Sequence, residues 1–263
     1  AFRVSNPWSF AHARRFGMRH LVYLPLMLDE EVYCSGTSAY RDEWARQSGG
    51  SFFVISTARM DDFYKGSDIA IKGFAAFSRL VPGARLVMIG WGEDREGSLT
   101  RLQEYGIADK VIPLPIVGKK RLIQYLRAAD CLLDQFVLGY YGATGLEAMA
   151  CGLPVTMRLE RAQYQGMCLT GAPPVIDAST AEEICAALTK LVADPAQRKR
   201  IASAHREWFL ANHGSEQWKG VYSDMLAATA FGHKFDFSDS PLAAPLSEEE
   251  KASGLILACR AVP

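Results

Sequence analysis

Two cationic residues lie on one segment that joins an apolar, strand-like stretch to a helix-like one. Arg59 and Lys65 stand in STARMDDFYKGSD, directly after the apolar residues 52–56. In an open parallel sheet, ligands bind outside the carboxyl ends of the strands. Two positive charges on a loop at such an end suit a diphosphate, because each ion pair gains Coulomb energy at a partly dry surface. Taken alone, the loop position slightly favours two ordinary solvated residues.

A glycine pair follows the next apolar stretch, in the segment GWGEDREG. Gly90 and Gly92 would let a ligand approach the backbone closely. A dinucleotide fingerprint needs GxGxxG at the start of the helix, but here Glu93 and Asp94 follow, and their carboxylates would repel a pyrophosphate. A nicotinamide or flavin role is therefore disfavoured. The chain also lacks a GxxxxGK[ST] segment, which disfavours a phosphate-binding-loop ATPase.

A third segment, GYYGATG, leads into the helix-like LEAMACG. The small residues Gly142, Ala143 and Gly145 leave first-turn amides open, and such a helix N-terminus binds anions. Glu147 lies about one turn further, among apolar neighbours. A carboxylate there would accept hydrogen bonds from paired hydroxyls, as an acidic residue does for a ribose. The alternative is a solvated glutamate that the helix dipole stabilises.

The elements that carry these segments alternate between short apolar runs and helical periodicity. The runs predict strands over 52–56, 85–89, 111–114, 131–137, 153–157 and 174–176, and the spacing predicts helices over 68–80, 99–105, 120–129, 142–151, 181–192, 195–211 and 215–230. Short strands that are apolar throughout and separated by helices indicate a parallel sheet covered on both faces. The expected fold is α/β, a doubly wound, Rossmann-like open sheet with a helical C-terminal arm.

Composition narrows the class of protein further. The 263 residues contain 29 Lys and Arg against 29 Asp and Glu, so the chain lacks the cationic surplus that nucleic acids or anionic membranes attract. No apolar run reaches the roughly 20 residues of a membrane span, and the first twenty residues do not form a signal peptide. The six cysteines contain no CxxC pair and the five histidines no HxxxH spacing, so no metal site is expected.

The segment from about Ser51 to His213 resembles the carboxy-terminal, donor-binding domain of the family 4 glycosyltransferases, which are retaining enzymes of the GT-B fold. The resemblance rests on an ordered set of motifs: Arg59 with Lys65 and Gly66, LVMIGWG, LRAADCLLDQF, GLEAMACGLPV and ADPAQRKRIASAHREWFLANHG. It implies a nucleotide diphosphate sugar as the donor. It also implies an enzyme that transfers a hexose-type sugar with retention, in glycan or cell-envelope polysaccharide synthesis.

The resemblance also implies roles for individual residues. Arg59 and Lys65 would grip the diphosphate and stabilise the leaving group, so that no metal and no cofactor is expected. Glu147 would accept the ribose hydroxyls. The other expected donor-binding positions are the amides near the α-helix start and the residues beside the base and the strand–glycine element: Gly142, Ala143, Thr144, Ile116, Leu122 and Gly90.

One departure from the family pattern concerns the sugar. The family has a glutamate eight positions before Glu147, and Gly139 stands there in this chain. Sugar recognition is therefore expected to differ, through Gln135 or through Tyr140 or Tyr141, and Asp134 is a further candidate. A second hypothesis follows: the chain is a non-catalytic scaffold or regulatory module that keeps the nucleotide-sugar fold.

The expected organisation is a linker or remnant of an N-terminal half over 1–50, a donor-binding domain over 51–213, and a helix and tail over 214–263. Both ends have the composition of connectors or packed arms. Because transfer in a GT-B enzyme takes place between two domains, the resemblance implies a missing N-terminal acceptor domain as the partner, and a chain that binds donor but transfers little alone. It implies a cytoplasmic location and leaves open a peripheral membrane contact through the missing half.

Overall fold

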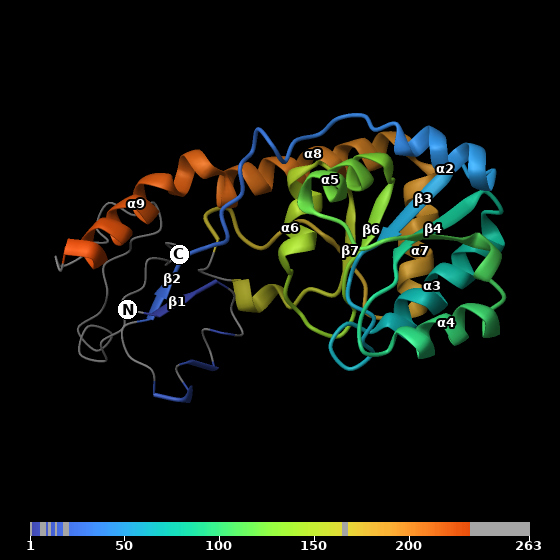
Figure 1. The fold of residues 1–263 in the computed structure, drawn as a ribbon, viewed down its shortest axis with the longest axis horizontal. Helices are drawn as coiled ribbons and strands as arrows, with labels where there is room; N and C mark the ends of the chain where they lie inside the picture. Colours follow the sequence, from blue (N-terminus) through green and yellow to red (C-terminus); the bar gives the residue numbers. More distant parts are fainter. Residues whose placement is uncertain are drawn as a thin grey trace. The chain divides into compact units, whose positions relative to one another are not determined.

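The computed structural model describes residues 2–5, 9, 12–13, 15–17, 21–164 and 168–231 (Figure 1). The chain forms two compact units. The larger unit consists of Tyr33–Leu159 and Pro174–Glu207, and the smaller one of the described parts of Ala1–Val32, Glu160–Pro173 and Trp208–Pro263. The functional residues predicted above all belong to the larger unit.

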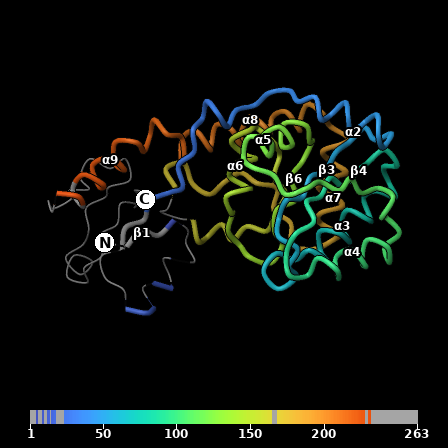
Figure 2. Tube along the Cα trace, in the orientation of Figure 1, coloured from blue at the N-terminus to red at the C-terminus, as the bar shows by residue number. Residues whose placement is uncertain are grey.

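The larger unit is built on a six-stranded sheet in the order β5-β4-β3-β6-β7-β8, in which every neighbouring pair is parallel. The strands are β3 (Phe52–Ser56), β4 (Ala84–Ile89), β5 (Val111–Leu114), β6 (Cys131–Leu133), β7 (Val155–Met157) and β8 (Ile176–Asp177). The chain starts at the central strand β3 and continues through β4 to the outermost strand β5. It then returns to β6, next to β3, and continues through β7 to the opposite outermost strand β8. Figure 2 shows β4, β3 and β6 side by side. This order confirms the predicted doubly wound, Rossmann-like sheet.

Helices cover both faces of this sheet. On one side lie α3 (Ser67–Leu80), α4 (Arg95–Glu104) and α7 (Ala181–Ala193), and on the other α2 (Tyr40–Ser48), α5 (Lys119–Ala128) and α6 (Ala143–Ala150). The helix α7 begins with a capping box formed by Thr180 and Glu183, which satisfies its first amides. The helix α8 (Pro195–His213) has its residues divided between the two units.

The core of the larger unit follows from the alternation of side chains along β3, all five of which are buried. Phe52 and Val54 belong to a cluster that includes Phe74 and Phe77 of α3, with the rings of Phe52 and Phe77 at 5.8 Å. Phe53 points to the opposite face, where its ring lies 5.6 Å from that of Trp44. Because both faces of the strand are apolar, the sheet is a buried layer between two helical layers.

The helix α2 was not predicted, since residues 1–50 were expected to be connectors or arms. It spans Tyr40–Ser48 and ends at Gly49, whose backbone is left-handed. Only Trp44 of this helix is buried, where it packs 5.9 Å from the ring of Tyr125. A helix with a single buried side chain has no apolar periodicity, so its sequence carries no signal that a periodicity search detects.

Other boundaries shift at the carboxyl ends of the strands. The strand expected over 131–137 ends at Leu133. Asp134 and Gln135 still make backbone hydrogen bonds to the β7 segment, from the Asp134 amide to the Thr156 carbonyl and from the Arg158 amide to the Gln135 carbonyl. The chain then turns away, because the Phe136 amide donates to the carbonyl of Lys65 at 2.8 Å. The residues beyond Gln135 therefore form a loop rather than a strand. The helix expected over 99–105 begins earlier, at Arg95.

The smaller unit contains a two-stranded parallel sheet, β1 (Phe2–Val4) with β2 (Leu21–Tyr23), and the helix α9 (Ser215–Phe231). Buried Trp218 donates to the carbonyl of Asn212 at 2.9 Å. The ring of buried His213 lies 2.6 Å from the carbonyl of Leu26. The expected tail beyond residue 231 lies outside the described residues.

Candidate functional site at the carboxyl edge of the sheet

The loop that carries the two predicted cations connects β3 to α3 and spans residues 57–66. Arg59 pairs with Asp61, Nη2 to Oδ2, at 2.5 Å, and its guanidinium lies 6.0 Å from the centre of the Tyr64 ring. Asp61 is buried and also accepts from the backbone amide of Tyr64 at 2.9 Å. The Arg59 side chain remains 35% exposed, so it is held at one end and still open to a ligand.

Lys65 joins this loop to the one that follows β6. Its Nζ donates to Oε1 of Gln135 at 2.9 Å, and its carbonyl accepts the Phe136 amide. The amide of Gln135 is neutral, so the positive charge of Lys65 is held in place without being cancelled. Among the described residues, Gln135 Nε2 is buried without a hydrogen-bond partner.

Asp134 lies between Lys65 and the start of α6. Burial raises the pKa of its carboxyl, while the Lys65 charge and a hydrogen bond from the Gly142 amide lower it. Its Oδ2 is buried with no hydrogen-bond partner within the described part of the chain. A Cβ at Gly145 would come within 2.8 Å of that oxygen, so glycine allows the helix to approach this carboxylate.

The first turn of α6 presents its amides to the same edge. The N-cap Gly142 is extended (φ −96°, ψ −175°) and has open space around it. Ala143 is exposed and Thr144 partly exposed. The first amides of a helix have no acceptor within the helix, and the helix dipole adds positive potential there. This turn therefore has the local geometry and potential that favour an anion, and its Gly142 amide already donates to the Asp134 carboxyl.

Glu147 lies in the next turn of α6 and is only 2% exposed. Its Oε1 accepts from Lys119 Nζ at 2.5 Å and from the Tyr33 hydroxyl at 3.4 Å. Burial, together with the charge of Glu147, raises the pKa of Tyr33 to about 12, so Tyr33 is a donor at physiological pH. The second oxygen, Oε2, is buried without a partner among the described residues. The alternative of a solvated glutamate is therefore wrong, because this carboxylate is buried and paired.

The two residues predicted to border a base, Ile116 and Leu122, differ in their exposure to solvent. Ile116 is 74% exposed and lines an open depression of about 590 Å³ together with the residues through Arg121. Leu122 is buried within α5 and lies outside that lining. The structure thus assigns the accessible apolar surface to Ile116 and Val117.

The glycine pair after β4 supports the cationic loop. Gly92 has φ +123°, and a Cβ there would lie 2.5 Å from the Met60 carbonyl, so only glycine fits. A Cβ at Gly90 would meet no neighbour closer than 3.7 Å. The Met60 amide donates to the Trp91 carbonyl at 2.7 Å, and the Asp94 amide donates to the Met60 carbonyl at 3.1 Å. The glycines at this turn therefore let the turn after β4 pack closely against the 57–66 loop.

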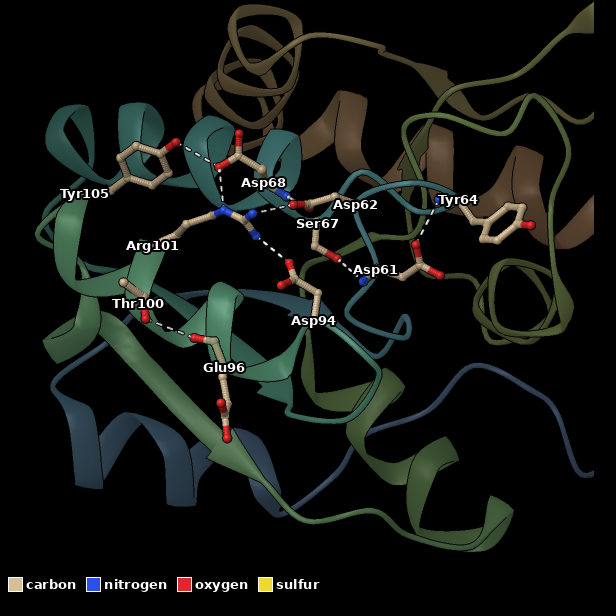
Figure 3. A network of polar contacts seen from close by, with 10 residues as sticks. All are labelled: Asp61, Asp62, Tyr64, Ser67, Asp68, Asp94, Glu96, Thr100, Arg101 and Tyr105. Carbon is tan, nitrogen blue, oxygen red and sulfur yellow. Dashed lines mark hydrogen bonds and ion pairs between the residues drawn. The ribbon is translucent and has the colours of Figure 1, made fainter.

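A network around Arg101 holds the same loop from the other side (Figure 3). Arg101 pairs with Asp62 at 2.5 Å, with Asp94 at 2.6 Å and with Asp68 at 3.5 Å. The hydrogen bond to Asp94 is the main cause of the raised pKa of Arg101. The charge of Asp94, which from the sequence was expected to repel a pyrophosphate, is thus neutralised by an arginine of α4.

Several residues of this edge were not predicted from the sequence. Asp61, Arg101, Lys119 and Tyr33 hold or complete the predicted groups. Asp61 lies within the quoted segment STARMDDFYKGSD but was given no role, and the other three lie outside the motifs singled out in the sequence. Lys119 and Tyr33 meet Glu147 from 28 and 114 positions away, so no local spacing relates them. Asp134 and Gln135, which directly follow the end of β6, were candidates from the sequence.

Neither a metal centre nor a membrane span is evident in the part of the chain that the structure describes. Within it, no group of three or more His, Cys, Asp or Glu residues is arranged to hold a metal ion. In the same residues, no helix is long and apolar enough to cross a membrane.

These features define a Rossmann-like α/β unit with cations, helix amides and a buried carboxylate at one sheet edge. Residues 41–208 match the family described as "Glycosyl transferases group 1". The chain therefore belongs to the group 1 glycosyl transferases, which confirms the resemblance noted in its motifs.

Individual relatives agree with this assignment. D-inositol 3-phosphate glycosyltransferase from Segniliparus rotundus is 28% identical over 172 residues, which cover 62% of this chain and 36% of the relative. The enzyme of the same name from Nocardiopsis dassonvillei is 29% identical over 199 residues, covering 70% and 45% respectively. The chain thus matches less than half the length of these relatives.

Solved structures show the same fold. The crystal structure of Anabaena HepE in complex with UDP and glucose matches with a TM-score of 0.70 over 86% of this chain and 62% of that one, at 16% identity. At this identity the likeness concerns the fold, which is of the GT-B class, and confirms the predicted fold class.

Proposed function

We propose that this chain binds the donor of a glycosyltransferase, a nucleotide diphosphate sugar, at the carboxyl edge of the sheet. The observation that carries the proposal is the junction of the two loops. The contacts of Lys65 with Gln135 and Phe136 hold the cationic loop against the loop that leads into α6. The diphosphate would lie between Arg59, Lys65 and the first amides of α6, near Gly142, Ala143 and Thr144, with the ribose hydroxyls on Glu147.

The same groups would serve the transfer step. Breaking the bond between sugar and diphosphate releases a nucleoside diphosphate, on which negative charge develops. Fixed cations and helix amides stabilise such charge because they are oriented before the reaction begins. We expect Arg59 and Lys65 to supply this charge, so that donor binding persists when divalent cations are chelated.

The activity of the whole protein is part of the same proposal. The two relatives described above are D-inositol 3-phosphate glycosyltransferases, and this chain matches 36% and 45% of their lengths. We propose transfer of a hexose-type sugar with retention, in glycan or cell-envelope polysaccharide synthesis in the cytoplasm. An acceptor-binding half would complete the site, because proximity of donor and acceptor supplies much of the rate.

The alternative is a module that keeps the fold without catalysis. The observation in its favour is Gly139, which carries no carboxylate at the position where the family pattern has one. Tyr140 and Tyr141 follow it, and burial, aided by Tyr64, raises the pKa of Tyr140. A parent protein that binds nucleotide but neither transfers nor hydrolyses a donor would establish this alternative.

Calorimetric titration with UDP and GDP tests the donor site. We expect Arg59→Ala and Lys65→Ala each to weaken binding at least about tenfold, since each removes a charge-assisted contact to phosphate. Arg200→Ala is the matched control, because Arg200 is 70% exposed and its ion pair with Asp194 is long, at 3.8 Å. Unchanged affinity in both loop variants, with the fold intact by circular dichroism, would contradict the assigned roles.

A further inference from the structure

Two adjacent residues after β6 each have a buried polar atom that lacks a hydrogen-bond partner among the described residues. These atoms are Oδ2 of Asp134, which is 6% exposed, and Nε2 of Gln135, which is fully buried. Both residues belong to the proposed donor site, because Gln135 accepts from the Lys65 ammonium at 2.9 Å. A polar atom that is buried without a partner costs free energy, so such atoms at a binding site indicate groups that a ligand or a proton completes.

The charge of the Asp134 carboxylate has two supports. The carboxyl accepts a hydrogen bond from the Gly142 amide, and the Lys65 ammonium acts on it through space. On the side of Oδ2 the backbone of α6 approaches closely, since a Cβ at Gly145 would lie 2.8 Å from that oxygen. A buried carboxylate stays ionised only while such supports persist, and otherwise it takes up a proton.

The other charged and titratable residues on the surrounding elements are engaged elsewhere. On the 57–66 loop, on and before α6, and after β7 they are Arg59, Asp61, Tyr141, Glu147 and Arg158. Two ion pairs account for three of them, Arg59 with Asp61 and Glu147 with Lys119. Arg158 donates to the Val137 carbonyl at 2.8 Å, and Tyr141 lies beside Gly145. Lys65 is therefore the titratable residue whose charge supports Asp134.

The diphosphate of the proposed donor would compete for both supports. In the proposed site it binds the Lys65 ammonium and the first amides of α6, and these include the Gly142 amide that Asp134 now occupies. Its negative charges would also lie near the buried carboxylate. Like charges in one poorly hydrated site raise the proton affinity of the weaker acid, which here is the carboxyl rather than the diphosphate of a sugar ester.

We propose that donor binding is coupled to the uptake of a proton by Asp134, which frees Lys65 and the Gly142 amide for the diphosphate. The proton comes from the solvent and is bound on the carboxyl, so the charge that the donor brings is partly neutralised. Asp134 is then a positioning residue, because it acts through Lys65 and α6. The inference rests on the proposed function, since it assumes that the diphosphate lies at this edge.

The same coupling would assist the transfer step. When the bond between sugar and diphosphate breaks, its electron pair stays on the terminal phosphate oxygen. The nucleoside diphosphate therefore carries one more negative charge than the donor, and it keeps this charge above its second pKa of about 6. A neutral Asp134 leaves the Lys65 charge to this oxygen. We expect at least as much proton uptake with UDP or GDP near pH 8 as with the sugar esters.

Calorimetric titration of the full chain in buffers of different ionisation enthalpy counts the protons. UDP-glucose and GDP-mannose are the ligands, because their diphosphates do not titrate between pH 6 and pH 8. We expect an uptake that reaches at least about 0.3 proton per bound ligand in this range. Since the complex then binds more protons than the free protein, affinity should fall at least about threefold from pH 6 to pH 8.

Asp134→Asn keeps the shape of the side chain but cannot titrate. We expect it to abolish the uptake, to hold the affinity within about twofold across the same pH range, and to bind more tightly than the wild type at pH 8. Asp109→Asn is the matched control, because Asp109 is exposed, and it should behave as the wild type. Infrared difference spectra of wild-type protein with isotope-labelled aspartate provide a second measurement, in which donor binding should produce the band of a protonated aspartic acid.

The outcomes separate this inference from the proposed function. Donor binding without proton uptake, or without the aspartic acid band, would overturn the coupling and leave the donor site standing. Equal uptake in Asp134→Asn and the wild type would overturn the assignment to Asp134. A smaller uptake with UDP or GDP than with the sugar esters would overturn the part in transfer. Failure of all four nucleotides to bind would overturn the proposed function and the inference with it.

Discussion

At the scale of single residues, Asp134 and Glu147 are two buried carboxylates at the same sheet edge that have different partners. Glu147 is stabilised by an ammonium group and a hydroxyl on one oxygen. Asp134 has a helix amide and a more distant ammonium charge, and burial outweighs them and raises its pKa. Glu147 thus keeps one buried oxygen, Oε2, without a partner among the described residues and in position to accept a hydroxyl, whereas burial raises the pKa of Asp134.

Glu147→Ala is expected to weaken nucleoside diphosphates about ten- to hundredfold, because one hydrogen bond from a ribose hydroxyl to a carboxylate contributes about 1.5–3 kcal/mol. Inorganic pyrophosphate has no ribose, so its affinity should stay within about twofold. Calorimetry on both ligands measures the difference. Equal losses for the two ligands would exclude the ribose role, and Glu147→Gln, which keeps one acceptor, should fall between the two proteins.

At the scale of elements, the cationic loop is rigid because three other segments hold it. The turn after β4 binds the backbone of Met60, Arg101 of α4 pairs with Asp62 (Figure 3), and the loop after β6 binds Lys65. Rigid positioning matters because a flexible loop would lose conformational entropy when it closes on a ligand.

Gly92→Ala tests this support. The left-handed backbone alone costs roughly 1–3 kcal/mol for a side chain, and the new Cβ would lie 2.5 Å from the Met60 carbonyl, so the free energy of unfolding should fall by about 2 kcal/mol or more. Donor affinity should fall with it, since Arg59 neighbours Met60. Gly90→Ala is the matched control with no contact under 3.7 Å; an equal effect of both substitutions in urea unfolding would refute the steric explanation.

At the scale of the whole molecule, two groups of the smaller unit have strongly shifted pKa values. In the smaller unit, burial lowers the pKa of His213 to about 4. Hydrogen bonds from backbone amides near the start of α9 oppose desolvation and lower the pKa of Glu30 to about 2. Both shifts make the folded state less stable in acid, because the unfolded chain binds these protons more readily than the folded one. His213 has this effect at higher pH than Glu30, since its ordinary pKa is higher.

Acidification from pH 7 to pH 5 is expected to lower the free energy of unfolding by about 2 kcal/mol through His213 alone. An unfolded histidine binds a proton near pH 6.5, whereas the folded one stays neutral until about pH 4. The unfolded state therefore binds more protons in this window, and stability falls as pH falls. Urea midpoints at the two pH values measure this, and His213→Gln should show a smaller pH dependence; an identical pH dependence in the variant would assign the effect to other groups.

Part of the fold follows from local sequence alone. The bounds of β3 and β5 agree with prediction because short, β-branched or aromatic runs end at turn residues. The helix α7 agrees within one residue because its apolar face repeats regularly and a capping box starts it. The helix α2 escaped prediction because distant residues hold it: Trp44 packs on Phe53 and Tyr125, and Arg41 pairs with Asp130.

The sequence by itself determined the doubly wound sheet, because short apolar runs that alternate with helical periodicity specify parallel strands. It also determined that Arg59 and Lys65 follow a strand end and that Glu147 lies in the first turns of a helix. Parallel strands bring their carboxyl ends to the same edge of the sheet, so these residues lie at one edge. Only the tertiary structure decided the partners of these groups. Lys119 and Tyr33 reach Glu147 from distant segments, and Gln135 reaches Lys65. Burial and distance, rather than spacing along the chain, decide which charges are compensated and which atoms are left for a ligand.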